Sequence, residues 1–263
     1  MKDYPIVLSI AGSDPSGGAG IQADIKAVSA CGGYAAAAIT AVTVQNTLGV
    51  SGVEYLPADL VERQIDAVMS DLAVDAVKIG MTGTAPVVEA IARQLSRHPV
   101  LYVVTDPVMV STSKDALTMP EAVEALCTCI FPKSHIVTPN IDEASRLAGF
   151  RIASVDDMDR AAVMLRDRYS CAFLVKGGDM GGDSTSTDVL CDIDGLVHFT
   201  SDRIATENLH GTGCTLSSSI ATFLGAGRPL REAVHSAVTY VHRAILAAAQ
   251  LRIGHGHGPL RHM

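Results

Sequence analysis

The stretch IVLSIAGSDPSGGAGIQADIKAVSACGG, residues 6–33, contains a complete strand–loop–helix unit. Its first six residues are almost wholly apolar, which predicts a buried strand. After the glycine-rich loop, Ile21, Ile25 and Val28 recur at helical spacing, which predicts a helix with these side chains on one side. The glycine pair at 32–33 then ends that helix. The rest of the chain decides how many such units are joined.

Strand-like and helical segments alternate through most of the chain. A helix is expected after Pro57, with an inner face of Leu60, Val61, Ile65, Val68 and Leu72. The further β-rich runs are AAAAITAVTV (35–44), VDAVKIG (74–80), VLYVVTD (100–106), HIVTPN (135–140) and CAFLVKGG (171–178). This alternation predicts an α/β fold with a mostly parallel central sheet and helices on both faces.

Two regions depart from the alternation. The segment 49–57, GVSGVEYLP, predicts a short strand at the sheet edge, and 187–204 predicts a hairpin that turns at Asp194-Gly195. The chain has 263 residues, of which 48% are hydrophobic, and it contains no low-complexity linker or internal repeat. We therefore expect a single domain spanning residues 1–263.

Charge and cysteine content exclude several classes of partner. The formal charge is −8 and there is no run of Lys or Arg, so neither nucleic acid nor an anionic membrane is an expected partner. The six cysteines lack zinc spacing, which favours free thiols in a reducing compartment. With no signal segment or apolar run long enough to span a membrane, we expect a soluble cytoplasmic protein that acts on a small molecule.

The glycine-rich loop nearly matches two nucleotide-binding motifs. Gly12 and Gly17 have Walker A spacing, but Gly18-Ala19 stands where Lys-Ser/Thr should hold phosphate and metal. A dinucleotide fingerprint also fits the glycines, yet Gln45 ends the second strand where an acidic residue is required. The loop could therefore approach a flat ligand, or it could be a plain glycine-rich turn.

Polar side chains follow several of the later predicted strands. Asp106 comes directly after one, where a carboxylate can hold hydrated Mg²⁺. Asn140 and Glu143 are three residues apart across a strand end and a helix start, so they form either part of a site or a helix capping box. Lys176 precedes two glycines at another strand end and is a candidate phosphate contact or a surface charge.

The segment HGTGCTL, residues 210–216, places Cys214 after a glycine pair at a predicted helix start. Backbone N–H groups and the helix dipole would favour a bound anion there, and they would favour the thiolate of the cysteine. The alternative is a tight loop with a packed cysteine. The tail 254–263 contains three histidines among glycines, which we interpret as a mobile terminus and not as a metal site.

In order along the chain, seven motifs closely resemble the hydroxymethylpyrimidine and phosphomethylpyrimidine kinases of thiamine biosynthesis, which belong to the ribokinase-like superfamily. They are AGSDPSGGAGIQAD, TVQNT, KIGM, DPVM, TPNIDEA, KGGD and HGTGCT, and the resemblance covers nearly the whole chain. It implies a three-layer sandwich with a small β edge or flap. It also implies ATP-dependent phosphorylation of the pyrimidine alcohol and then of its monophosphate.

The resemblance also implies roles for the matching positions. The pyrimidine pocket would be lined by Gly12, Asp24, Gln45 and Met81, with Asp24 and Gln45 reading the ring nitrogens and the amino group. Asp106 and Glu143 would bind Mg²⁺, and Asn140 and Lys176 would bind the nucleotide. The anion hole would be formed by Gly211, Thr212, Gly213 and Cys214, with the thiol replacing the aspartate base of the sugar kinases. ATP and Mg²⁺ are the expected cofactors, and a homodimer or higher homo-oligomer is expected.

Two departures and two alternatives accompany this hypothesis. Glu207 and Leu209 stand where Lys and Thr are expected, so a carboxylate beside the anion hole would weaken nucleotide binding unless it points away. A pyridoxine-type kinase shares the fold and the cysteine, but Gln45 and the GTGC sequence favour an aminopyrimidine. A non-catalytic vitamin-binding protein would not need the carboxylates at the strand ends.

Overall fold

The computed structural model describes residues 4–109, 118–178, 180 and 184–263. Its strands are β1 (Ile6–Ser13), β2 (Tyr34–Asn46), β3 (Gly49–Tyr55), β4 (Ala76–Ile79), β5 (Tyr102–Thr105), β6 (Ile136–Val137), β7 (Ala172–Val175), β8 (Thr185–Asp192) and β9 (Gly195–Asp202). Its α-helices are α1 (Gly20–Ala30), α2 (Ala58–Asp71), α3 (Ala85–Arg97), α4 (Pro120–Ala125), α5 (Ile141–Ala148), α6 (Val155–Tyr169), α7 (Thr212–Gly225) and α8 (Leu230–Ala248). A π-helical turn (Leu126–Ile130) and a 3-10 turn (Phe131–Lys133) follow α4.

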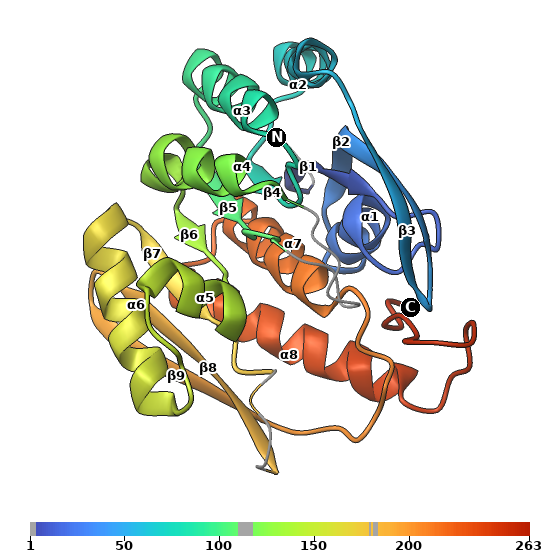
Figure 1. Ribbon diagram of the computed structural model, residues 1–263, viewed down its shortest axis with the longest axis vertical. Coiled ribbons are helices and arrows are strands. Elements are labelled where there is room, and N and C mark those ends of the chain that lie inside the picture. The colour runs from blue at the N-terminus through green and yellow to red at the C-terminus, as the bar shows by residue number, and fades with distance from the viewer. Residues whose placement is uncertain (1–3, 110–117, 179, 181–183) are drawn as a thin grey trace.

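Nine strands of the described residues form one sheet, in the order β3-β2-β1-β4-β5-β6-β7-β8-β9 (Figure 1). The six strands from β2 to β7 in this order are parallel, whereas β3 at one edge and the β8–β9 hairpin at the other are antiparallel. The hairpin turns before Gly195, whose φ of 102° is accessible to glycine without strain. The predicted parallel sheet, edge strand and hairpin are confirmed.

Helices cover both faces of the sheet, as the alternation predicts. Helices α2 to α6 lie on one face, and α1, α7 and α8 lie on the other (Figure 1). Successive residues of a strand point to opposite faces. In β1, Leu8 and Ile10 accordingly join the core under α2 to α6, whereas Val7 packs against the core under α7 and α8. This is the three-layer sandwich that the resemblance implies.

Helix α1 is rotated from the prediction by about one residue. Ile21 and Val28 are buried, but Ile25 is 39% exposed, so the three side chains do not share one buried side as predicted. The inner face instead includes the fully buried Asp24 and Ala27. Small side chains at this face allow α1 to pack closely against α7. Successive residues of a helix are about 100° apart around its axis, so Ile25, which follows the buried Asp24, is turned outward.

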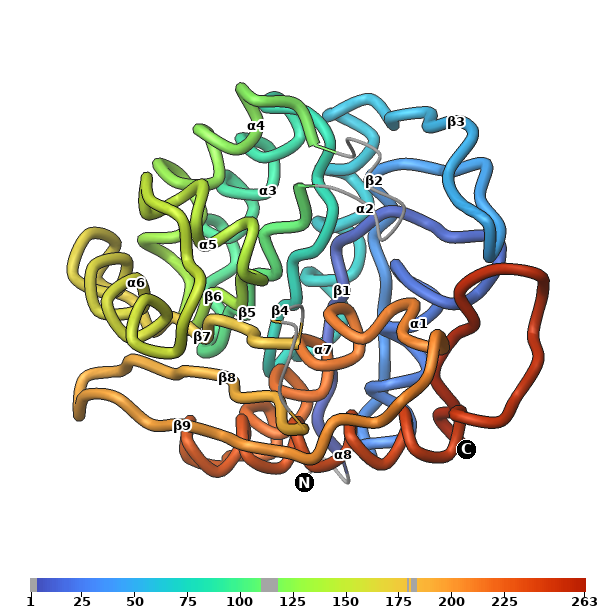
Figure 2. Tube along the Cα trace, turned by 60° about the horizontal axis from the view of Figure 1, so that its bottom comes forward, coloured from blue at the N-terminus to red at the C-terminus, as the bar shows by residue number. Residues whose placement is uncertain are grey.

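The C-terminal tail was predicted to be a mobile terminus, and this is wrong. After α8 the chain turns back and lies beside the β2–β3 turn, as Figure 2 shows. The tail ends with Leu260 buried among residues of α7 and α8. Of the described helices, none combines the length and the apolar character that a bilayer-spanning segment needs.

Candidate active site

A cavity of about 690 Å³ lies at the carboxyl ends of the parallel strands. Doubly wound sheets bind ligands at this edge, near the point where the strand order reverses, which here falls between β1 and β4. Eleven of the twelve predicted site residues line the cavity: Gly12, Gln45, Met81, Asp106, Asn140, Glu143, Lys176, Gly211, Thr212, Gly213 and Cys214. The exception is Asp24.

The start of α7 has the features of a site for an anion. The N-cap residue Gly211 has a φ of 84°, and a Cβ on it would lie 1.9 Å from the Gly18 carbonyl oxygen, so no other residue fits there. Within the described residues, the N–H groups of Gly213 and Cys214 have no hydrogen-bond acceptor. Unpaired N–H groups at a helix N-terminus attract anions such as phosphate.

A lysine–carboxylate pair lies beside this helix start. Lys176 Nζ donates a hydrogen bond to Asp106 Oδ1 at 2.8 Å, and a Cβ on Gly213 would lie 3.2 Å from the same Nζ. Burial opposes the charge on Lys176, but Asp106 and Glu143 outweigh this effect and raise the pKa of the amine. Lys176 is therefore a fixed cation in the cavity wall and not a surface charge.

Asn140 and Glu143 form the capping box of α5 and also line the cavity. Asn140 Oδ1 accepts from Glu143 N at 2.8 Å, and Glu143 Oε2 accepts from Asn140 N at 2.8 Å. Glu143 Oε1 accepts a third bond, from Met109 N at 3.3 Å. Burial raises the pKa of Glu143 to about 7, with Lys176 opposing the change and Asp106 adding to it. The pair therefore caps the helix and lines the cavity at the same time, so the two alternatives do not exclude each other.

The thiol of Cys214 is protonated at neutral pH. The helix N-terminus was expected to favour the thiolate, but burial raises the pKa of Cys214 to about 11. The charge on Lys78 favours ionisation, whereas Asp24 and Asp106 oppose it. The expectation of a thiolate is therefore not supported, because burial, with a smaller contribution from the two carboxylates, outweighs the opposing charge of Lys78.

Asp24 does not line the cavity, so its predicted place in the pyrimidine pocket is not seen in this structure. Lys78 Nζ lies 2.9 Å from both of its carboxylate oxygens, and neither side chain is exposed. Ser9 Oγ and Ser218 Oγ donate further hydrogen bonds to it, at 2.5 and 2.7 Å. All of its strong acceptor positions are directed at the protein interior, between α1, β4 and α7.

Gln45 contacts a buried His210–Asp14 pair whose function the sequence did not reveal. His210 Nε2 lies 2.9 Å from Asp14 Oδ2 and 3.3 Å from Gln45 Nε2, and all three residues line the cavity. Burial favours a neutral Asp14, but hydrogen bonds from His210, Ser16 and Ala19 outweigh it and lower the pKa of Asp14 to about 2. Asp14 is therefore a carboxylate at neutral pH.

This carboxylate determines the hydrogen-bond direction at Gln45. Because Asp14 can only accept, His210 Nε2 must carry the proton, and it has no lone pair for the amide NH₂ group. A half-turn of the amide, which exchanges its O and N atoms, resolves the conflict. The NH₂ group then faces Thr43 Oγ1, which is 3.1 Å from the amide and donates its own proton to Ser13 O. One N–H and one carbonyl lone pair of Gln45 remain for a ligand.

The two departures from the family pattern do not obstruct the cavity. Glu207 is exposed and is not part of the cavity wall, so its carboxylate points away from the anion site. Leu209 does line the cavity and is 43% exposed. The structure thus removes the expected repulsion of a nucleotide by Glu207.

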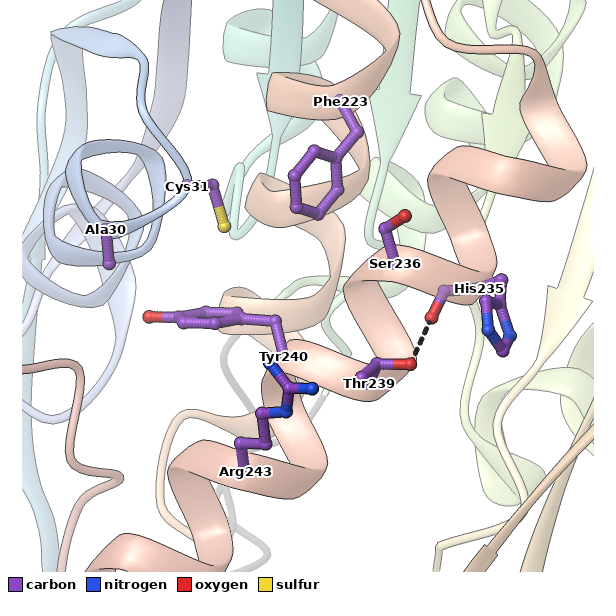
Figure 3. A pocket seen from close by; sticks show the side chains of 8 residues that line it. All are labelled: Ala30, Cys31, Phe223, His235, Ser236, Thr239, Tyr240 and Arg243. Atoms are coloured by element: carbon purple, nitrogen blue, oxygen red, sulfur yellow. Dashed lines mark hydrogen bonds between the residues drawn. The ribbon is translucent and has the colours of Figure 1, made fainter.

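A second recess, of about 410 Å³, lies between the end of α1 and helices α7 and α8 (Figure 3). Cys31, Phe223, Tyr240 and Arg243 contribute to its walls. None of the twelve predicted site residues, all of which the structure describes, lies in this recess. We therefore place the chemistry in the larger cavity.

The doubly wound sheet, the anion site on α7 and the lysine–carboxylate cluster at the strand ends define a small-molecule phosphotransferase with a ribokinase-like fold. A family profile described as phosphomethylpyrimidine kinase matches residues 14–261. A hydroxymethylpyrimidine/phosphomethylpyrimidine kinase from Rhizobium meliloti is 51% identical over 98% of this chain and 96% of its own length. The chain belongs to the phosphomethylpyrimidine kinase family.

Solved structures of two activities share the fold. A phosphomethylpyrimidine kinase from Clostridium difficile has a TM-score of 0.81 and 40% identity, covering 92% of this chain and 99% of its own. A pyridoxal kinase from Bacillus subtilis, in complex with ADP, has a TM-score of 0.91 and 31% identity, covering 99% of this chain and 98% of its own. These likenesses confirm the ribokinase-like fold and the kinase class.

The raised pKa of Glu143 predicts a pH-dependent stability. The folded protein holds a proton that the unfolded chain releases above its ordinary pKa of 4.5, so the free energy of unfolding should fall between about pH 4.5 and 7. We expect Glu143→Gln, which keeps the capping partner, to reduce this fall by about 1–3 kcal/mol. Urea unfolding at pH 5 and pH 7.5 measures it. Identical pH dependence in both proteins would contradict the prediction.

The buried ion pair predicts a large loss of stability in Asp24→Asn. The variant leaves the charge of Lys78 buried without a counter-ion, which costs about 3–5 kcal/mol in the free energy of unfolding. Urea unfolding measures the loss, and the double variant Asp24→Asn/Lys78→Met, which removes both charges, should recover part of it. If stability were unchanged while the KM for the acceptor rose, Asp24 would contact the substrate after all.

Proposed function

We propose that the protein uses ATP to phosphorylate hydroxymethylpyrimidine and then its monophosphate, which gives the diphosphate used in thiamine biosynthesis. The observation that carries this proposal is the arrangement of the cavity: the open amide of Gln45 lies in the same cavity as the anion site of α7. Relatives with this activity, over nearly the full chain, support the choice of substrate.

The acceptor end of the cavity suits an aminopyrimidine. A ring nitrogen next to an amino group presents one acceptor and one donor side by side. The N–H and the carbonyl lone pair that remain on Gln45 form the complementary pair. Asp24 was expected to share this task, but the Gln45 amide alone can supply both the donor and the acceptor. Met81 and Gly12 offer an apolar, close wall for the ring: the two residues are near enough that a Cβ on Gly12 would lie 2.9 Å from Met81 Cε.

The nucleotide end has fixed positive and hydrogen-bonding groups. Lys176 provides a positive charge for a phosphate. The N–H groups of Gly213 and Cys214 can stabilise the negative charge on the phosphoryl group during its transfer. Asn140 uses only its Oδ1 in the capping box, so its Nδ2 is available to donate to the triphosphate. These groups position the phosphates without any covalent step by the protein.

Mg²⁺ fits this end of the cavity as a partner of the phosphates. No group of three or more His, Cys, Asp or Glu side chains in the described part of the chain could hold a metal alone. Mg²⁺ does not need one, because it keeps waters and binds one or two carboxylates together with phosphate oxygens. Asp106 fits as a direct ligand through Oδ2, which has only a 3.5 Å contact with Ser217. Glu143, whose oxygens accept backbone N–H groups, fits as a partner of bound water. When bound, the ion would neutralise phosphate charge.

Cys214 is the proposed base for the first phosphorylation. The pyrimidine alcohol must lose a proton as it attacks, whereas the monophosphate is largely ionised near neutral pH because its second pKa is about 6. With a thiol pKa of about 11, only a small thiolate fraction is present at pH 7. The alternative role is packing at the helix start, which would affect both steps alike.

A pyridoxal kinase is the second candidate, since solved pyridoxal kinases share the backbone closely. Gln45 favours the pyrimidine, because its amide pair would be only partly satisfied by a pyridine ring. A non-catalytic vitamin-binding protein is disfavoured by the Lys176–Asp106 cluster, which such a protein does not need.

We further propose a single domain over residues 1–263, supported by the one sheet. A cytoplasmic homo-oligomer is also proposed, supported for the compartment by six free cysteines.

Substrate selectivity tests the proposed function. We expect the wild type to prefer hydroxymethylpyrimidine to pyridoxal in kcat/KM, with magnesium ATP as the donor. Gln45→Met should lower kcat/KM for the pyrimidine about 10- to 100-fold, because each lost buried hydrogen bond costs about 1–3 kcal/mol. A coupled assay with both acceptors measures this, and an unchanged KM for ATP serves as the control. Equal turnover of both acceptors by the wild type would refute the assignment.

The two half-reactions test the role of Cys214. If the thiolate is the base, phosphorylation of the alcohol should speed up about tenfold per pH unit between pH 7 and 9, because the thiol ionises near pH 11. We expect Cys214→Ala to slow the alcohol step about 100-fold or more and the phosphate step far less. Cys214→Ser keeps the side-chain volume and controls for packing. Equal losses in both steps, or none, would exclude the base.

A further inference from the structure

The segment 254–260, which we call the C-terminal strap, joins two parts of the cavity wall that are far apart in sequence. One part is the β2–β3 turn, which contains Thr47 and follows Gln45 by two residues. The other is the segment 207–210, which leads into α7 and ends at His210. In Figures 1 and 2 the tail runs from the end of α8 to this edge of the sheet and back.

Thr47 is the point of attachment on the β2–β3 turn. Its Oγ1 accepts hydrogen bonds from His255 N at 3.1 Å and from Gly256 N at 3.2 Å. Its carbonyl oxygen accepts from His257 N at 2.9 Å. Three consecutive N–H groups of the strap are therefore directed at one residue of the turn, which fixes the position of the turn more firmly than a single contact would.

The strap is attached to the segment 207–210 at several points. His210 N donates to Gly258 O at 3.1 Å, and His257 Nδ1 lies 3.4 Å from Glu207 O. Outside the strap, Asn208 Nδ2 also donates to Ala248 O at 2.7 Å, at the end of α8. The backbone of His210 is thus held by the same segment that holds Thr47.

Glycine is required where the strap meets its neighbours. A Cβ on Gly256 would lie 2.1 Å from the Thr47 carbonyl oxygen, which is backbone and cannot rotate away. A Cβ on Gly254 would lie 2.2 Å from Thr47 Oγ1, and one on Gly258 would lie 2.0 Å from Asn208 Oδ1. Close backbone contact therefore requires glycine at 256, whereas at 254 and 258 the space is filled by the side chains of Thr47 and Asn208.

We propose that the C-terminal strap positions the acceptor site, by holding the turn after Gln45 and the backbone of His210 at the separation at which these two side chains meet. The Gln45 amide and His210 Nε2 are 3.3 Å apart. The ring of His210 is also held by Asp14, but in the described residues no strand pairing joins β2 directly to 207–210, so the strap is the segment that bonds to both backbones. By holding Thr47 and the backbone of His210, the strap would set the orientation of the Gln45 amide. The inference rests on the proposed role of Gln45 in binding the pyrimidine.

The position of the strap predicts an effect on one substrate and not on the other. Displacement of the β2–β3 turn moves Gln45 relative to the ring. In the described residues the strap donates no hydrogen bond to Lys176, Asn140 or residues 211–214, although it holds His210 just before them. Hydrogen-bonded recognition loses rate and affinity steeply with a displacement of about 1 Å. The KM for the pyrimidine should therefore rise while the KM for ATP stays constant.

The test compares Gly256→Ala with Gly149→Ala in the full-length protein, using initial rates with each substrate varied. Gly256→Ala is expected to raise the KM for hydroxymethylpyrimidine at least tenfold and to change the KM for ATP less than twofold. Gly149, at the end of α5, has a φ of 80° and open space around its Cβ, so its alanine variant is destabilised without disturbing the cavity. Its KM values should equal those of the wild type. Melting temperatures of both variants show whether loss of stability alone explains the result.

Thr47→Val and Thr47→Ser provide a second, milder pair. Valine removes the acceptor of two strap N–H groups and should raise the KM for the pyrimidine, whereas serine keeps the hydroxyl and should restore it. Suppose that Gln45→Met raises the KM for the pyrimidine but that Gly256→Ala and Thr47→Val leave it unchanged. This result would overturn the role of the strap and leave the role of Gln45 intact. Equal rises in both KM values would also overturn the role of the strap. If Gln45→Met itself had no effect, the proposed acceptor site would be wrong, and the strap inference would fail with it.

Discussion

The buried ion pair of Asp24 and Lys78 connects the elements that build the cavity. Asp24 belongs to α1 and Lys78 to β4, and the carboxylate also binds hydroxyls from β1 and α7. Burying two charges is costly. The cost is offset only when both partners stay in place and their remaining lone pairs and protons are hydrogen-bonded. The pair therefore resists any relative shift of these four elements. Since α7 carries the anion site, the direction of its N-terminus depends on this interaction.

Close contacts between glycines and distant backbone complete the cavity. The glycine-rich loop after β1 is organised by Asp14, whose carboxylate accepts N–H groups of Ser16, Gly18 and Ala19. The carbonyl of Gly18 then meets Gly211 at the start of α7, where a side chain has no room. The loop after β1 and the start of α7 are thus packed directly against each other, so that the two substrates would meet with little space for water between them.

Sequence patterns predicted the layers of the fold and most of the cavity because both follow from short-range periodicity. Polar residues at strand ends must gather at one edge of a parallel sheet, and Asp106, Asn140 and Lys176 do so. Asp24 was misplaced because its partner Lys78 lies on another strand, and no local pattern reveals a pairing across the fold. The raised pKa of Cys214 and the contacts of the tail with Thr47 escaped prediction for the same reason, since burial and long-range contacts decide both.

Backbone likeness does not separate the two vitamin kinase activities in this fold. The pyridoxal kinase matches the backbone more closely than the phosphomethylpyrimidine kinase does, although it is less identical in sequence. Discrimination must therefore come from a few polar groups in the cavity, where an unpaired buried donor or acceptor costs about 1–3 kcal/mol. The Gln45 amide is the group that we propose for this task. Its direction follows from the Asp14 carboxylate, which can only accept the hydrogen bond of His210 Nε2, so an amide held in this way would reject a ligand edge with the wrong polarity.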